Sequence, residues 1–252
     1  MSKELTTIAI ADLGFAFLPV LVVCVILYRW SHNVRGAIVA VSRMLAQLLA
    51  VGYVLAFIFR TDRALVVLGT LAVMFAAASW ISLGPVREER GRLLAKALIS
   101  IALGGVTTLV LITQGVLRLD PWFEPRYMIP LAGMIFANAM NAISLAAERF
   151  TSELRNGRDY LEARRIAYSA SLIPITNSLL AVGIVAIPGM MTGQILAGAS
   201  PLVAVRYQIM VMAMVFGSAG ISSACFLRFI RPPDKADVIG KAAETAPTGD
   251  AA

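Results

Sequence analysis

Long apolar stretches alternate with short polar loops along this chain. Each stretch has about 20 residues, which is the length that an α-helix needs to cross a hydrocarbon core of about 30 Å. The pattern predicts an all-α, polytopic integral membrane helix bundle. We expect about seven transmembrane helices, at residues 8–28, 38–59, 64–84, 94–117, 127–147, 167–187 and 205–230.

The composition agrees with this prediction. Of the 252 residues, 59% are hydrophobic and only 15% are charged, and the mean hydropathy is +0.80. These values lie outside the usual range of soluble globular domains. The chain starts without a basic segment and continues into a long apolar stretch without a small-residue cleavage site. We therefore expect a first span there and no removable signal peptide.

The basic residues decide the expected orientation. Lys and Arg number 22 against 15 Asp and Glu, and they lie mostly between the apolar stretches. Fifteen of them fall on one side of the predicted spans and six on the other. Because basic loops stay cytoplasmic, the N-terminus is expected outside and the C-terminus inside, in the plasma (inner) membrane. No basic face interleaved with aromatics is present, so nucleic acid is a poor partner for this chain.

Two segments lie outside the spans. The charged stretch 148–165 is expected to form a cytoplasmic amphipathic helix. The end of the chain, 231–252, is polar and rich in Pro, Ala and Thr, and we expect it to be a disordered cytoplasmic tail. Residues 1–230 are then one transmembrane domain surrounded by membrane lipid.

Ionisable and amide side chains inside spans are functional candidates, because they are costly at membrane depth unless they are paired or wetted. Asp12 lies near the outer end of the first span, where it either lines a pathway or reaches the lipid headgroups at the membrane interface. Arg43 and Gln47, four residues apart, share one helical face, and Arg43 faces protein or snorkels to the interface. Asn138 and Asn141 either bond a neighbouring helix or line a polar cavity, and Asn177 follows Pro174 in the sixth span.

The segment after Pro188, GMMTGQILAGASPLVAVRY, is too polar for another span and too apolar for an exposed loop. We expect Pro188 to end the sixth helix and a re-entrant or interfacial segment to follow near 189–200. Small residues at 189, 193 and 197 favour close helix packing. Met190 and Met191 are soft metal ligands in one interpretation and packing residues in the other, which is the stronger.

The sequence contains no motif for nucleotide binding or hydrolysis. No GxxxxGK[ST] loop and no Ser/His/Asp set occur, so the chain is not expected to be an enzyme or to carry its own cofactor. Cys24 and Cys225 lie in apolar stretches, and the one histidine, His32, falls in a loop. No disulfide framework and no firm metal site are predicted.

Three strings carry a family likeness. They are WFEPRYMIPLAGMIFANAMNAISLAAERF (122–150), LIPITNSLLAVGIVAIPGMMTGQILAGASPLVAVRYQIMVM (172–212) and SRMLAQLLAVGYVLAFIF (42–59). Together they resemble the FetB-type ABC transporter permeases, an iron-export family related to plant aluminium-tolerance transporters. The likeness runs from Arg43 to Phe229, and PGMMTGQILAG is its most specific part.

The resemblance implies a transmembrane subunit that forms a homodimer and works with a separate cytoplasmic ABC ATPase, which would bind ATP-Mg. It implies export of a metal ion such as iron, although plant relatives are linked to aluminium tolerance and UDP-glucose movement. Substrate-pathway residues are then expected at Arg43, Gln47, Glu124, Asn138, Asn141, Asn177, Met190, Met191, Thr192 and Gln194. ATPase-coupling residues are expected at Glu153, Arg155, Arg158, Asp159 and Glu162.

One departure from the family pattern concerns the coupling region. Family members carry a stretch of the form Glu-Ala-x-x-x-Leu-Gly-Ala-Ser/Thr-Pro and another short helix before the sixth span. In this chain NGRDYLEA (156–163) is followed directly by RRIAYSASLIP (164–174), so most of that stretch is missing after Ala163. The charged stretch 148–165 is then a shortened coupling helix or a solvated connection. The alternatives to a metal exporter are a degenerate permease or membrane scaffold without transport, export of another small substrate, and a secondary transporter using Asp12 or Glu148.

Overall fold

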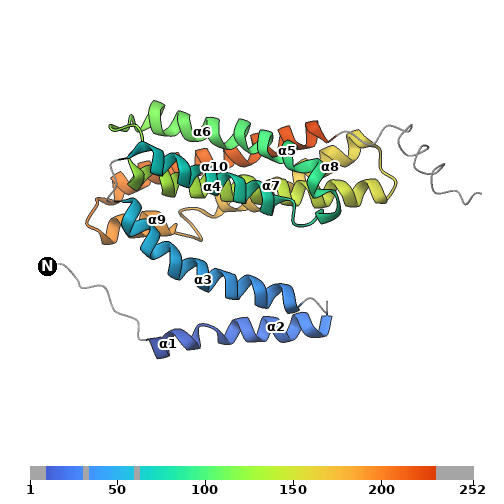
Figure 1. Cartoon of the computed structure of the whole chain (residues 1–252), viewed down its shortest axis with the longest axis horizontal. Coiled ribbons are helices and arrows are strands. Elements are labelled where there is room, and N and C mark those ends of the chain that lie inside the picture. The colour runs from blue at the N-terminus through green and yellow to red at the C-terminus, as the bar shows by residue number, and fades with distance from the viewer. Residues whose placement is uncertain (1–9, 31–33, 60–62, 231–252) are drawn as a thin grey trace, which may run out of the picture. The chain divides into compact units, whose positions relative to one another are not determined.

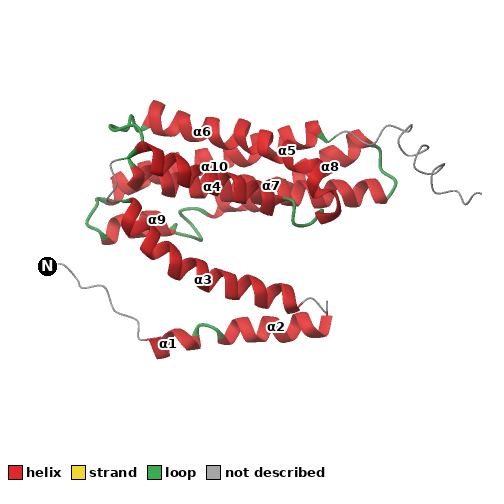
Figure 2. Ribbon diagram, in the orientation of Figure 1, coloured by secondary structure: helices red, strands yellow, loops and turns green. Residues whose placement is uncertain are grey.

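The computed structural model describes residues 10–30, 34–59 and 63–230, and Figure 1 shows their course. The chain divides into two compact units, residues 1–61 and 62–252, which are described separately. Most of the described residues are helical (Figure 2). These ranges contain no β-strand, and their one β-bridge is an isolated pair between Val182 and Ala186. The predicted tail, 231–252, lies outside the described residues.

The first unit contains α1 (Ile10–Phe15), α2 (Leu18–Trp30) and α3 (Val34–Ile58). The predicted first span is thus two helices with a turn at 16–17. Pro19 explains the break, because a proline in the second position of α2 has no N–H to continue the helix from α1. Helices α2 and α3 pack against each other.

The second unit begins with α4 (Ala64–Ser82) and a loop containing the short 3₁₀ helix η1 (Arg87–Glu89). A long helical run follows, made of α5 (Arg90–Ile101), η2 (Ala102–Val106), α6 (Thr107–Val110) and η3 (Leu111–Val116). Both η2 and η3 have π-helical hydrogen bonding, so this run is wound more loosely at two depths. Such π segments are uncommon and often lie at functional positions.

Four helices complete the second unit: α7 (Pro125–Arg155), α8 (Tyr160–Ala181), α9 (Gly189–Leu196) and α10 (Pro201–Phe229). Helix α7 is the centre of the core and packs against α4, α8 and α10. Its buried positions recur every three or four residues, from Leu131 through Ile135, Ala139 and Ala142 to Ala146. The spacing matches one face of an α-helix, so the apolar pattern of α7 explains its central place.

Small residues bring the loosely wound run close to α10. A Cβ added at Gly104 would lie 2.2 Å from the Ser222 hydroxyl oxygen, 2.6 Å from the Ser222 backbone nitrogen and 2.9 Å from the Ser218 carbonyl oxygen. A Cβ at the neighbouring Gly105 would touch the ring of Phe136 on α7 at 3.2 Å. The glycine pair therefore allows a backbone contact with α10 on one side and ring packing on α7 on the other.

Six helical segments within the described ranges are long and apolar enough to cross a membrane. They are Asp12–Trp30, Val34–Ile58, Ala64–Ser82, Arg87–Val116, Pro125–Arg155 and Pro201–Phe229. Helix α8 is not among them, although its 22 residues measure about 33 Å and it packs along α7 and α10. The chain is a polytopic helical membrane protein, and seven spans with an outside N-terminus stay predictions.

Two expected helix boundaries differ from the structure. The charged stretch 148–165 is not one helix, because α7 ends at Arg155 and α8 begins at Tyr160. Pro188 does not end the sixth helix, because α8 already stops at Ala181. Gly183 has a φ of +81°, a conformation that favours glycine and turns the chain away from the helix axis. Pro188 instead occupies the N-cap position of α9, without a side-chain cap bond.

Candidate functional site

A tight turn joins α7 to α8 at the end of the second unit that is predicted to face the cytoplasm. Gly157, with φ of +82°, donates its N–H to the Leu154 carbonyl at 3.1 Å, and the Arg158 N–H bonds the Glu153 carbonyl at 3.1 Å. This pair of bonds is the Schellman ending of a helix. Asp159 then caps α8 by accepting the Glu162 N–H at 2.7 Å. The four-residue connection is thereby fixed at both helix ends.

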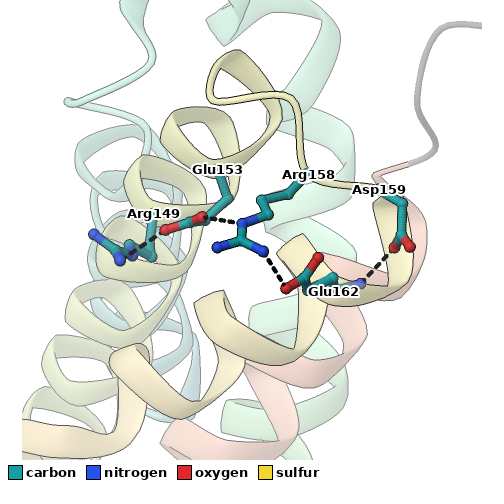
Figure 3. Close-up of polar contacts among 5 residues, drawn as sticks. All are labelled: Arg149, Glu153, Arg158, Asp159 and Glu162. Carbon is teal, nitrogen blue, oxygen red and sulfur yellow. Dashed lines mark hydrogen bonds and ion pairs between the residues drawn. The ribbon is translucent and has the colours of Figure 1, made fainter.

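A chain of opposite charges crosses this turn (Figure 3). The Glu153 carboxylate is nearly buried and lies 2.7 Å from the Arg149 guanidinium and 4.0 Å from the Arg158 Nε. Arg158 also donates to the Glu162 carboxylate at 2.7 Å. Both arginines are about half exposed, so the buried carboxylate is neutralised from its solvent side. The arrangement ties the last turns of α7 to the first turn of α8.

The start of α8 is also attached to α10. The Tyr160 hydroxyl donates to the Leu227 carbonyl at 3.0 Å, and its ring meets Phe150 of α7 edge to face, with centroids 5.7 Å apart. A displacement of the α7–α8 turn would therefore reach α7 and α10 together. Tyr160 connects a surface turn to two core helices.

A cavity of about 460 Å³ lies beside this turn. Its walls are the α4–α5 loop and the last turns of α7, with residues Gly84, Pro85, Val86, Arg87, Glu88, Glu89, Glu148, Thr151, Ser152, Arg155 and Asn156. The loop is steadied by Arg90, whose guanidinium stacks 4.5 Å over the Trp80 ring. Together the turn and the cavity form a polar surface of mixed charge, which we call the coupling surface (residues 84–89 and 148–162).

The five predicted coupling residues lie in the 148–162 part of this surface, and their role in coupling stays a prediction. Glu153 is buried, Asp159 caps α8, and Arg158 and Glu162 form an exposed ion pair. Arg155 lines the cavity. Arg149 and the loop 84–89 also belong to the surface, and the sequence does not predict them as part of it. The i, i+4 spacing of Arg149 and Glu153 is a sequence pattern that indicates an ion pair on one helical face. No such pattern exists for the loop, because only the fold brings it next to α7.

The predicted pathway amides on α7 and α8 are not brought into one cluster. The Asn138 side chain is half buried and donates to the Met134 carbonyl of its own helix at 2.8 Å. Asn141 and Asn177 are exposed in the described chain. Because hydrocarbon does not satisfy amide groups, Asn141 needs protein or water beside it at membrane depth, and so does Asn177 if α8 crosses the membrane as the sequence predicts.

The segment after Pro188 forms the eight-residue helix α9, which packs on α10. Met190, Met191 and Gln194 are half buried, and Thr192 donates to the Pro188 carbonyl at 3.2 Å. The Gln194 amide oxygen is buried without a hydrogen-bond partner. The expected close packing of small residues is not present in the described chain, because a Cβ at Gly189 or Gly193 would meet open space.

The remaining pathway candidates lie elsewhere. Arg43 and Gln47 are exposed on α3 of the first unit, and Glu124 is the N-terminal flanking residue of α7 without a side-chain cap bond. Asp12 is exposed on α1. Across residues 10–30, 34–59 and 63–230, no three His, Cys, Asp or Glu side chains gather as a metal site would require.

The fold thus defines a multi-pass helical membrane protein with a charged surface at one end of its bundle. Comparison with protein families gives a match to the one described as "Uncharacterised protein family (UPF0014)", over residues 10–166 and 160–232. The chain belongs to this family. No solved structure matches it significantly.

Curated relatives cover most of the chain. A UPF0014 membrane protein of Synechocystis is 33% identical over 232 aligned positions, covering 85% of this chain and 89% of the relative. The "Probable iron export permease protein FetB" of Escherichia coli is 36% identical, covering 86% and 90%. "Protein ALUMINUM SENSITIVE 3" of Arabidopsis thaliana is 32% identical, covering 82% and 81%.

Proposed function

We propose that this protein is the membrane-spanning permease subunit of an ATP-binding cassette exporter in the plasma (inner) membrane, and that its cargo is a metal ion such as iron. The observation that carries the proposal is the 36% identity to the Escherichia coli protein named as a probable iron export permease, over most of both chains. The chain contains no GxxxxGK[ST] loop. ATP and Mg²⁺ would therefore be bound by a separate cytoplasmic ATPase.

The coupling surface supports a contact with that ATPase. It gathers charged groups of both signs at the end of the bundle that is predicted to be cytoplasmic, and its turn is bonded to α7, α8 and α10. A polar rim of exposed charges is typical of a docking surface for a soluble partner. In this proposal, closure of the ATPase presses on the α7–α8 turn and moves the helices that pack on it.

The exposed amides support an assembly of more than one copy. Asn141 and Asn177 need protein or water at membrane depth, and a permease homodimer around a polar pathway would provide both. Gln194 and the two methionines of α9 would then lie near the pathway as polar and soft groups. Iron is the cargo we favour, and another metal or a nucleotide sugar is the competing cargo.

The test is reconstitution with the ATPase encoded nearest to this protein in its genome. The two chains are co-expressed, purified together and placed in proteoliposomes, and ATP hydrolysis is measured with Fe²⁺, Al³⁺ or UDP-glucose. We expect co-purification and stimulation by Fe²⁺, with no hydrolysis when the ATPase Walker lysine is replaced by alanine. Co-purification without stimulation by any substrate, together with unchanged cellular iron in a deletion strain, would reject the exporter.

A degenerate permease is the second candidate, and a specific observation favours it. The α7–α8 connection has only four residues, and both of its helix ends are already capped, so no separate short helix projects from it. The two parts of the family match also meet at residues 160–166. The alignment with the Synechocystis relative has 232 positions but covers only 85% of this 252-residue chain, so the relative contains residues that this chain lacks. Inserting the relative's extra stretch after Ala163 distinguishes the candidates. A gain of ATPase binding favours the degenerate permease, and unchanged binding rejects it.

A further inference from the structure

We propose that a second cavity, between α8 and α10, binds the phosphodiester headgroup of an anionic membrane lipid. The cavity measures about 320 Å³, which is in the range of small-ligand pockets. Its lining residues are Arg164, Arg165 and Tyr168 from α8, and Ala224, Leu227 and Arg228 from α10. This site requires neither an ATPase nor a transported substrate, so it is independent of the proposed function.

The charge of the cavity selects an anion. Three of its six lining residues are arginines, and none is acidic. Within the described residues, Arg164, Arg165 and Arg228 form no salt bridge, in contrast to the paired arginines of the α7–α8 turn. The Arg164 guanidinium lies over the Tyr160 ring, 5.6 Å from its centroid. Guanidinium groups bind phosphate through two parallel hydrogen bonds, so three arginines without an acidic partner suit a phosphate-bearing group.

The apolar part of the cavity selects a lipid over free phosphate. Leu227 is buried in the wall, and Ala224 lies one turn before Arg228 on α10, which is long and apolar enough to span the membrane. Ile221, one turn before Ala224 on α10, is 47% exposed and provides an apolar surface for an acyl chain. A headgroup held by the arginines would therefore have its tails along membrane-facing helix surface.

The position of Tyr168 also fits a membrane interface. Its hydroxyl lies against α10 at Gly220, 3.6 Å from where a Cβ would stand, so the ring bridges the two helices at the inner edge of the cavity. Aromatic side chains with a polar tip are typical of the headgroup level. Basic pockets between helix ends on the cytoplasmic side are a known form of anionic-lipid site. The cavity lies at the end of the bundle that the charge pattern predicts to be cytoplasmic.

Native mass spectrometry of the full chain in detergent tests the site. The delipidated protein is titrated with cardiolipin, phosphatidylglycerol or phosphatidylcholine, and separately with inorganic phosphate. Four forms are compared: wild type, Arg165→Gln, the double variant Arg165→Gln with Arg228→Gln, and Arg92→Gln. The Arg92→Gln control removes an exposed charge at the same end of the bundle, outside the cavity. Circular dichroism checks that each form is helical.

We expect one tightly held cardiolipin or phosphatidylglycerol in wild type and in Arg92→Gln. Binding should weaken several-fold in Arg165→Gln and at least tenfold in the double variant, and phosphatidylcholine should bind weakly to all forms. If the double variant does not fold, the binding of anionic lipid by Arg165→Gln alone tests the proposal. Equal binding of the anionic lipids in all forms would overturn the proposal, as would saturation by inorganic phosphate without retention of an anionic lipid.

Discussion

The hydroxyl of Tyr160 donates a hydrogen bond of 3.0 Å to the main-chain carbonyl of Leu227. Tyr160 is the first residue of α8, directly after the charged turn, and Leu227 lies in the last turn of α10. The bond joins two elements that are 67 residues apart in the sequence. A force applied to the turn would therefore have a direct route into α10.

Tyr160→Phe removes this bond and keeps the ring packing on Phe150. A hydrogen bond of this kind contributes about 1 kcal/mol net, so we expect a small loss of thermal stability. If the route matters, stimulation of a bound ATPase should fall more than ATPase binding does. Hydrolysis and co-purification are measured on the same preparation. Equal loss of both would show that the bond serves only the fold.

The close approach at Gly104 predicts a steric effect. In Gly104→Ala the new Cβ would meet the Ser222 hydroxyl and two backbone atoms of α10, and overpacking of this kind costs about 1–3 kcal/mol. Gly115→Ala is the matched control in the same helical run, because its Cβ would meet only Leu111 at an ordinary 3.5 Å. Thermal unfolding in detergent compares the two.

Removal of the Ser222 side chain should not rescue Gly104→Ala. The Ser222 nitrogen and the Ser218 carbonyl would still lie within 3.0 Å of the new Cβ, and backbone atoms do not move aside as a hydroxyl does. The double variant Gly104→Ala with Ser222→Gly should therefore unfold at a temperature well below wild type. Recovery of the wild-type value would show that the helix backbones are further apart than described.

Glu153→Gln tests the buried carboxylate. The change removes the charge that faces Arg149 and Arg158, and both arginines are half exposed, so water recovers part of the loss. We expect a destabilisation of about 1–2 kcal/mol, below the value of a fully buried pair. Glu89→Gln, which removes an exposed carboxylate from an equally short ion pair with Arg92, should cost less than about 1 kcal/mol. Equal costs would contradict the burial of Glu153.

Helix α9 carries the most specific sequence string, and two substitutions test its part in transport. Gly193→Leu should leave membrane insertion unchanged, because its side chain would enter open space in the single chain. Gln194→Ala should also insert normally, since its buried amide oxygen has no partner to lose. Both should impair metal export if α9 lines the pathway. Normal export by both variants would move the pathway away from α9.

Much of the fold follows from residue patterns that act locally. The apolar stretches and the helical spacing of buried residues in α7 predict the helices and the class of protein, because burial in lipid or core needs nothing beyond side-chain hydrophobicity. Helix breaks were harder to place. Pro19 divides the first span, whereas Pro130 and Pro174 lie inside unbroken helices, so a proline alone does not locate a break.

The candidate site was predicted in part. The charged residues of 148–165 identify a surface segment, but a turn at Gly157 divides it into two helices. The 460 Å³ cavity needs the α4–α5 loop beside α7, and the second cavity needs α8 beside α10. These contacts join residues that are tens of positions apart, and no local pattern encodes which helices become neighbours. The same limit applies to Gly104, whose importance depends on Ser222.

The most direct test of the coupling surface compares the two ends of the second unit. Arg158→Gln removes an exposed charge from the α7–α8 turn, and Arg126→Gln removes one from the first turn of α7 at the opposite end. The measurement is the rate of iron-stimulated ATP hydrolysis by the reconstituted pair. We expect Arg158→Gln to lower this rate several-fold and Arg126→Gln to leave it at the wild-type value. Equal rates in all three forms would contradict this expectation.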